Sequence, residues 1–241
     1  WNLPLNPWKD SLEFLFTKGS FPIQRAILEL TWNKPDVISD QLIIYKIKKE
    51  DDISPHALMC ANDRGLKNDI TKLDNYLNHD NNSLQIAYAV TLLSNDKESK
   101  ISEELINRIH KSNIVENQIE LIGFLKRHPH LLSSMYITDY LQNANIKIKN
   151  EMLRFLINNP NISYFNHIFN LMEKPSTEIL ATKSLLALNK KVTFSKLSDI
   201  FYASRTKIKS KKLIIKLLHH FIHEEVLTLI FTAMDSSHLS L

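Results

Sequence analysis

An apolar doublet recurs along the chain at an interval of about 31 residues, and this period constrains the fold more than any single motif. Second residues of successive doublets are 31, 34, 32, 31, 30 and 32 residues apart. The doublets are Ile27-Leu28, Leu58-Met59, Leu92-Leu93, Phe124-Leu125, Phe155-Leu156, Leu185-Leu186 and Leu217-Leu218. An internal repeat of this length is typical of an architecture in which each repeat is one supersecondary unit.

A second series of apolar positions lies between the doublets and has nearly the same period. Its members are Leu15, Ile43, Leu73, Leu105, Ile137, Ile168, Ile200 and Ile230. Two interleaved series with one period predict two helices in each repeat. We therefore expect about fifteen helices of roughly 10–14 residues, arranged as about seven pairs and a terminal helix.

Local patterns favour helices at these positions. Ile101, Leu105 and Ile109 share one helical face, at i, i+4 and i+8. A helical pattern that begins at Val115 stops before Pro129, where the ring cannot continue a helix. Only 3 glycines occur in 241 residues, which argues against a hairpin-rich β protein.

Each helix pair has more apolar surface than it can bury alone, so stacking of the pairs predicts an α-solenoid. The signatures of tetratricopeptide and ankyrin units are absent. The repeats resemble short, degenerate HEAT-like pairs over nearly the whole chain. This resemblance implies an all-α, right-handed α-α superhelix. Because no long linker breaks the series, we expect one HEAT-like repeat domain over residues 1–241.

Apolar runs of four or five residues are far shorter than the ~20 that span a bilayer, so we expect no membrane insertion within this segment. No secretory signal is visible, and we expect a cytoplasmic location. Since the chain begins with Trp1, we expect a fragment of a longer protein. Cys60 is the single cysteine, which excludes an intrachain disulfide, and its apolar neighbours predict a small core residue.

Charge is distributed unevenly along the chain. Residues 1–120 hold 14 Lys/Arg and 18 Asp/Glu, a net charge of −4, whereas residues 121–241 hold 16 and 8, a net charge of +8. Such an asymmetry suggests that the C-terminal half faces an acidic partner.

The segment KIKSKKLIIKLLHH, residues 207–220, carries five lysines and is expected to be the second helix of the seventh pair. Its apolar face consists of Leu213, Ile214, Leu217, Leu218 and the adjacent Phe221. In HEAT-type solenoids the second helices line the concave surface, so the resemblance implies a basic groove. The predicted partner-binding residues are Lys126, Arg127, Lys149, Arg154, Lys183, Lys209, Lys212 and Lys216. A merely solvated helix face is the alternative.

These features favour a non-enzymatic protein–protein interaction scaffold that binds an acidic partner segment on a basic concave face. Nucleic-acid binding by the same face is the alternative function, since a basic groove also gathers phosphates. However, the aromatic residues of the basic half lie mostly at core spacing and are not interleaved with the lysines. An enzyme with sparse groove residues also stays open.

A search for chemistry in the sequence leads us to expect no catalytic residue, no metal site and no cofactor. His219 and His223 lie at i, i+4, but the order is not that of a zincin and no third ligand follows. Gly-rich phosphate loops, G-x-S-x-G and Cys-x-x-Cys are absent.

The N-terminal segment is too apolar for a free tail. Trp1, Leu3, Leu5 and Trp8 are held in an extended lead-in by two prolines. Two interpretations stay open: the segment caps the first repeat, or it docks a preceding domain.

Overall fold

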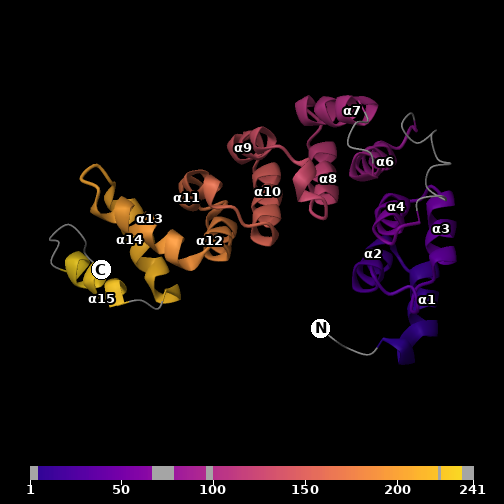
Figure 1. The fold of residues 1–241 in the computed structure, drawn as a ribbon, viewed down its shortest axis with the longest axis horizontal. Helices are drawn as coiled ribbons and strands as arrows, with labels where there is room; N and C mark the ends of the chain where they lie inside the picture. The colour runs from indigo at the N-terminus through magenta and orange to yellow at the C-terminus, as the bar shows by residue number, and fades with distance from the viewer. Residues whose placement is uncertain (1–4, 67–78, 96–99, 222–223, 235–241) are drawn as a thin grey trace. The chain divides into compact units, whose positions relative to one another are not determined.

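The computed structural model describes residues 5–66, 79–95, 100–221 and 224–234, and every regular element in these ranges is a helix (Figure 1). The described residues contain no strand. The prediction of an all-α chain is therefore confirmed. The chain forms two compact units, Trp1–Leu131 (unit 1) and Leu132–Leu241 (unit 2). The expectation of a single repeat domain stays a prediction.

Short connections separate the helices of each unit. Unit 1 contains η1 (Asn6–Trp8), α1 (Lys9–Lys18), α2 (Phe21–Leu30), α3 (Asp40–Lys48), α4 (Ser54–Asp63), α6 (Asn82–Asn95), α7 (Lys100–Lys111), α8 (Val115–Leu125) and η3 (Pro129–Leu131). Unit 2 contains α9 (Ser134–Gln142), α10 (Ile146–Asn158), η4 (Ile162–Tyr164), α11 (Phe165–Met172), α12 (Glu178–Ala187), α13 (Lys190–Tyr202), α14 (Ile208–Leu217), η5 (Leu218–His220) and α15 (Glu224–Met234).

Local sequence sets several helix ends. At the start of α3, the Ser39 hydroxyl accepts a hydrogen bond from the Leu42 amide, which satisfies one of the orphan donors of the first turn. After α4, Gly65 takes a φ of +78°, and the Leu66 amide donates to the Ala61 carbonyl. A left-handed glycine at this position is the usual way to end a helix and turn the chain sharply.

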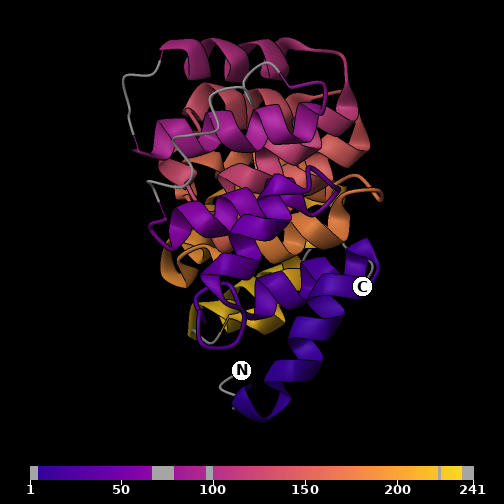
Figure 2. The same ribbon diagram turned by 90° about the vertical axis from the view of Figure 1, so that its right-hand side faces the viewer.

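The helices stack as pairs within each unit. In unit 1, α3 packs on α4 and α7 on α8, while α2, α4, α6 and α8 pack on one another in succession. Figures 1 and 2 show the helices of unit 1 as successive layers. In unit 2, α9 packs on α10, α11 on α12 and α13 on α14, and α10 also packs on α12. Neighbouring second helices therefore bury each other's apolar faces.

The predicted doublets supply the core of these stacks. Leu28, Leu58, Leu125, Leu156 and Leu218 are each at most 1% exposed. In the second series, Ile43, Leu105, Ile137 and Ile168 are buried, and Leu73 lies outside the described residues. The apolar period thus identified the buried face of most helices.

Leu15, the first member of the second apolar series, does not belong to the core. Its side chain is 40% exposed, whereas the next residue, Phe16, is fully buried. One residue along a helix turns the side chain by about 100°, so the core position moves to the larger aromatic ring. The Lys46 ammonium lies 5.6 Å from the centroid of that ring.

Hydrogen bonds also follow the repeat period. The Trp32 indole N–H donates to Asp63 Oδ2 at 2.9 Å, 31 residues away. The Asn62 side-chain amide donates to Ser94 Oγ at 2.9 Å, 32 residues away. Equivalent ends of successive second helices are therefore joined by polar contacts as well as by apolar packing.

The N-terminal segment divides between buried and exposed side chains. Leu5 is buried, Trp8 is 64% exposed, and Trp1 and Leu3 lie outside the described residues. The cap and the docking surface both stay predictions. Nowhere in the described ranges is a helix both long enough and apolar enough to cross a bilayer.

Candidate functional site

Two of the predicted binding residues, Lys126 and Arg127, follow α8 in unit 1. The Arg127 guanidinium donates to Glu29 Oε2 at 2.6 Å and stacks 3.7 Å from the centroid of the Trp32 ring system. Both contacts hold the guanidinium against the end of α2. Arg127 thus links α8 to α2 through a charge pair and a cation–π contact.

The same contacts extend into a wider polar network in unit 1. Asp63, at the end of α4, accepts from Trp32 and lies 3.1 Å from His128 Nε2 through its other carboxylate oxygen. The network therefore connects the ends of α2, α4 and α8. Because its charged groups pair with one another, we interpret it as a structural cross-link of unit 1.

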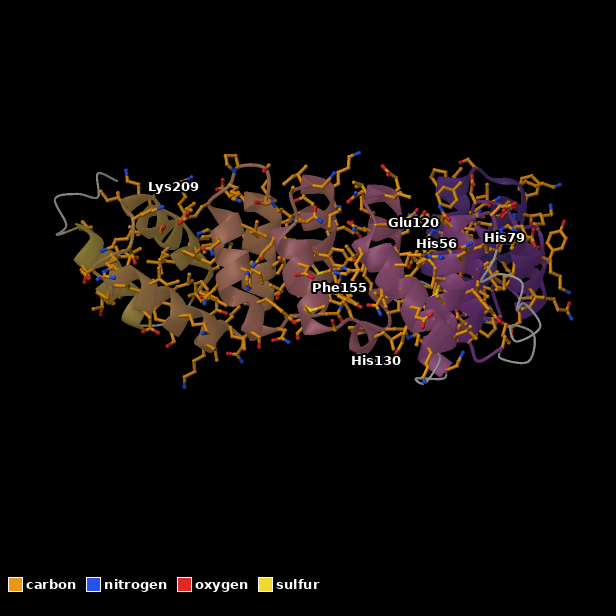
Figure 3. All side chains as sticks on the ribbon, turned by 90° about the horizontal axis from the view of Figure 1, so that it is seen from above. His56, His79, Glu120, His130, Phe155 and Lys209 are labelled. Carbon is orange, nitrogen blue, oxygen red and sulfur yellow. The ribbon has the colours of Figure 1, made fainter. Side chains whose placement is uncertain are left out.

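The other predicted binding residues lie in unit 2. Lys183, Lys209, Lys212 and Lys216 are exposed, Lys149 is half-buried, and Arg154 donates to Glu151 Oε2 at 2.9 Å. The predicted apolar face of α14 is confirmed, since Leu213, Ile214, Leu217, Leu218 and Phe221 are all buried. Figure 3 shows Lys209 at the outer edge of unit 2 and Phe155 among the helices.

Lysines begin several helices of unit 2, where the helix dipole opposes them. The pairs are Lys147 and Lys149 in α10, Lys190 and Lys191 in α13, and Lys209 and Lys211 in α14, and none of these three helices has an acid in its first turn. A helix N-terminus carries partial positive charge, so each cation there is unfavourable by about 0.3–1 kcal/mol.

Four helices of unit 1, α1, α3, α7 and α8, carry Asp10, Asp40, Glu103 and Glu116 in their first turns. In unit 2, α12 carries Glu178 there. Acids at these positions stabilise their own helices through the dipole. The lysines at the starts of α10, α13 and α14 have no such acid within their own first turns.

Glu173, which follows α11, fixes the start of α14. Its carbonyl accepts from Lys209 Nζ at 2.6 Å, and its carboxylate accepts from the Ser210 hydroxyl. Lys174 is the next residue and lines a pocket together with Lys149. The edge of unit 2 that holds the connections between the two helices of each pair therefore carries Lys149, Lys174 and Lys209.

The pocket that Lys149 and Lys174 share has a volume of about 240 Å³. It is lined by Leu141, Gln142, Lys149, His167, Asn170, Leu171 and Lys174. Its walls come from the end of α9, the start of α10, and α11 with the turn that follows. Sequence reasoning missed Lys174 and His167, because neither lies on a second helix and neither shares a helical face with Lys149.

The candidate metal and nucleophilic residues do not form sites among the described residues. No cluster of three or more His, Cys, Asp or Glu side chains suited to a metal ion occurs in the described part of the chain. His219 is exposed, and His223 lies outside the described residues. Cys60 is fully buried, as predicted, and burial raises the pKa of its thiol to about 12, which keeps it protonated and unreactive.

Comparisons with protein-family models, with curated proteins and with solved structures gave no match to this chain.

Proposed function

We propose that this chain is a non-enzymatic, HEAT-like α-solenoid scaffold whose basic surface in unit 2 binds an acidic segment of a partner protein. The observation that carries the proposal is the set of lysines in the first turns of α10, α13 and α14, without any acid beside them in those turns. An acidic segment along this surface would supply the missing negative charge. Helix-pair packing within each unit and hydrogen bonds at the repeat interval support the solenoid, and we extend it to a right-handed superhelix.

A protein partner is favoured over nucleic acid by the placement of the aromatic rings. Proteins that bind single-stranded nucleic acid stack bases on exposed aromatic side chains. In unit 2, Tyr164, Phe165, Phe169 and Phe201 are buried, and Tyr202 is 53% exposed. Most of these aromatic rings of unit 2 are therefore part of its core, and its surface offers mainly charge–charge contacts.

Changing Lys147, Lys190 and Lys191, which are exposed first-turn lysines of α10 and α13, together to Gln is expected to weaken binding of an acidic peptide about tenfold. Exposed ion pairs contribute roughly 0.5 kcal/mol each, and three of them correspond to about one factor of ten. The loss should appear mostly as slower association, because exposed charges act by steering. The measurement is fluorescence anisotropy and stopped-flow association of a labelled Asp/Glu-rich peptide, with the Asn/Gln version of the peptide as reference.

The matched control changes Lys9, Lys48 and Lys111 to Gln, which removes the same charge from exposed positions of unit 1. The control is expected to bind the acidic peptide almost as the unchanged protein does. Equal losses in both variants would mean that only net charge matters, and the proposed surface would be wrong. Labelled single- and double-stranded DNA and RNA, titrated over a salt series, test the alternative: tighter binding of a nucleic acid than of the peptide would replace the proposal.

A further inference from the structure

The pocket between α9, α10 and α11 gathers positive and hydrogen-bond-donating groups from separate elements of unit 2. Lys149 comes from the first turn of α10, His167 from α11, and Lys174 from the turn after α11. The side-chain amides of Gln142 and Asn170 also line it. A pocket of about 240 Å³ with these walls has room for one small oxyanion and several donors for its oxygens.

No carboxylate lines this pocket. The nearby acids have other partners, since the Glu173 carboxylate accepts from Ser210 and the Glu151 carboxylate accepts from Arg154. Burial lowers the pKa of Lys149, and the charge of Lys174 lowers it further. The half-buried Lys149 and the exposed Lys174 therefore line one pocket in which their charges repel and no acid of the pocket wall offsets them.

We propose that this pocket binds a phosphate monoester, a phosphoserine or phosphothreonine side chain of the partner segment. The inference rests on the proposed function, because it names the group by which the acidic partner is anchored. A phosphate monoester carries a charge of about −1.5 to −2 near pH 7, which matches two lysines. Its three terminal oxygens can each accept a charge-assisted hydrogen bond, whereas a carboxylate offers two oxygens and one charge.

The first experiment uses inorganic phosphate and needs no partner protein. Isothermal titration at constant ionic strength is expected to show phosphate binding to the unchanged chain, and at least tenfold weaker binding to the double variant Lys149→Gln, Lys174→Gln. The matched control, Lys48→Gln with Lys111→Gln, removes the same charge and is expected to bind phosphate unchanged. Absence of phosphate binding by the unchanged chain, or equal binding by the double variant, would overturn the proposal.

A second readout separates a binding site from a structural role. Without phosphate, the double variant is expected to unfold at a higher temperature than the unchanged chain, because the repulsion between the two lysines is gone. With phosphate, only the unchanged chain should gain stability, since a ligand stabilises the state that binds it. A double variant that is less stable than the unchanged chain without phosphate would assign the lysines to the fold instead.

The source of the phosphoryl group is tested with three probes. A phosphoserine peptide should bind at least tenfold more tightly than the same peptide without phosphate, and this difference should vanish in the double variant. The third probe is a single-stranded RNA oligonucleotide. If the RNA binds only when both lysines are present, and the two peptides bind with equal affinity, the pocket would be reassigned to a nucleic-acid backbone. Phosphate binding can persist even if the Asp/Glu-rich peptide does not bind, so failure of the proposed function and failure of the pocket are distinguishable.

Discussion

Replacing Arg64 by Leu is expected to destabilise unit 1 by about 3 kcal/mol, the upper end of the cost of leaving a buried acceptor without its donor. The Arg64 side chain is 4% exposed. Its guanidinium donates to the backbone carbonyls of Thr31, Trp32 and Ile38 at 2.7 Å and to the Asp40 carboxylate at 2.9 Å. One side chain therefore binds three backbone carbonyls of the segment that connects α2 to α3.

Leucine has no donor, so the Ile38 carbonyl would lose the charged partner that Arg64 supplies. The Thr31 carbonyl would keep the Lys34 amide and the Trp32 carbonyl would keep the Cys60 thiol, but each would lose its stronger, charged donor. Each buried group left without a hydrogen bond costs about 1–3 kcal/mol. Urea unfolding followed by tryptophan fluorescence measures this loss well, because all three tryptophans, Trp1, Trp8 and Trp32, belong to unit 1. The exposed control is Asp40→Asn, which keeps a hydrogen-bond acceptor and should cost less than about 1 kcal/mol. Similar losses for Arg64→Leu and Asp40→Asn would contradict the interpretation that the carbonyls dominate.

The helices and their buried faces were predictable from the sequence because apolar burial is periodic. A residue such as Leu58 or Leu156 must point inward in every repeat, so its position recurs at the repeat interval. Arg64 shows the limit of this reasoning. It follows the last residue of α4, where a cation is ordinary, and its partners lie 24 to 33 residues earlier. Nothing in local spacing marks it as buried.

The candidate site was predictable only in part for the same reason. Lys209, Lys212 and Lys216 belong to one helix, so their common face could be predicted from their i, i+3 and i+7 spacing. Lys149 and Lys174 meet across two helices and a turn, and their separation of 25 residues matches no repeat interval. The sequence shows that the C-terminal half is basic, but side chains from different elements must be placed in space before a pocket can be recognised.

Lowering the pH from 7 to 4 is expected to remove up to about 3 kcal/mol of stability from unit 1 through His56 alone. Its ring lies between two aromatic rings, with centroid distances of 5.9 Å to Phe21 and 5.4 Å to Phe124. Burial, and then the charge of Arg25, lowers the pKa of His56 from 6.5 to about 4. The folded protein therefore holds this imidazole neutral, packed between α2 and α8.

Stability falls as the pH is lowered because the unfolded chain takes up the proton at a higher pH than the folded protein does. Above pH 6.5 the imidazole is neutral in both states, and His56 makes no pH-dependent contribution. Between pH 6.5 and about 4 the unfolded chain binds a proton that the folded chain does not, so stability falls by up to about 1.4 kcal/mol per pH unit. Below pH 4 both states are protonated and the loss stops growing.

The change that isolates this effect is His56→Leu, which keeps an apolar side chain between the two rings and removes the titrating group. Urea unfolding of both proteins at pH 4, 5, 6 and 7 gives the difference in unfolding free energy between them, in which the contributions of all other groups cancel to first order. That difference is expected to shift by up to about 3 kcal/mol in favour of the Leu variant as the pH falls from 7 to 4. A difference that stays constant over this range would mean that His56 reaches water and titrates in the folded protein as it does in the unfolded chain.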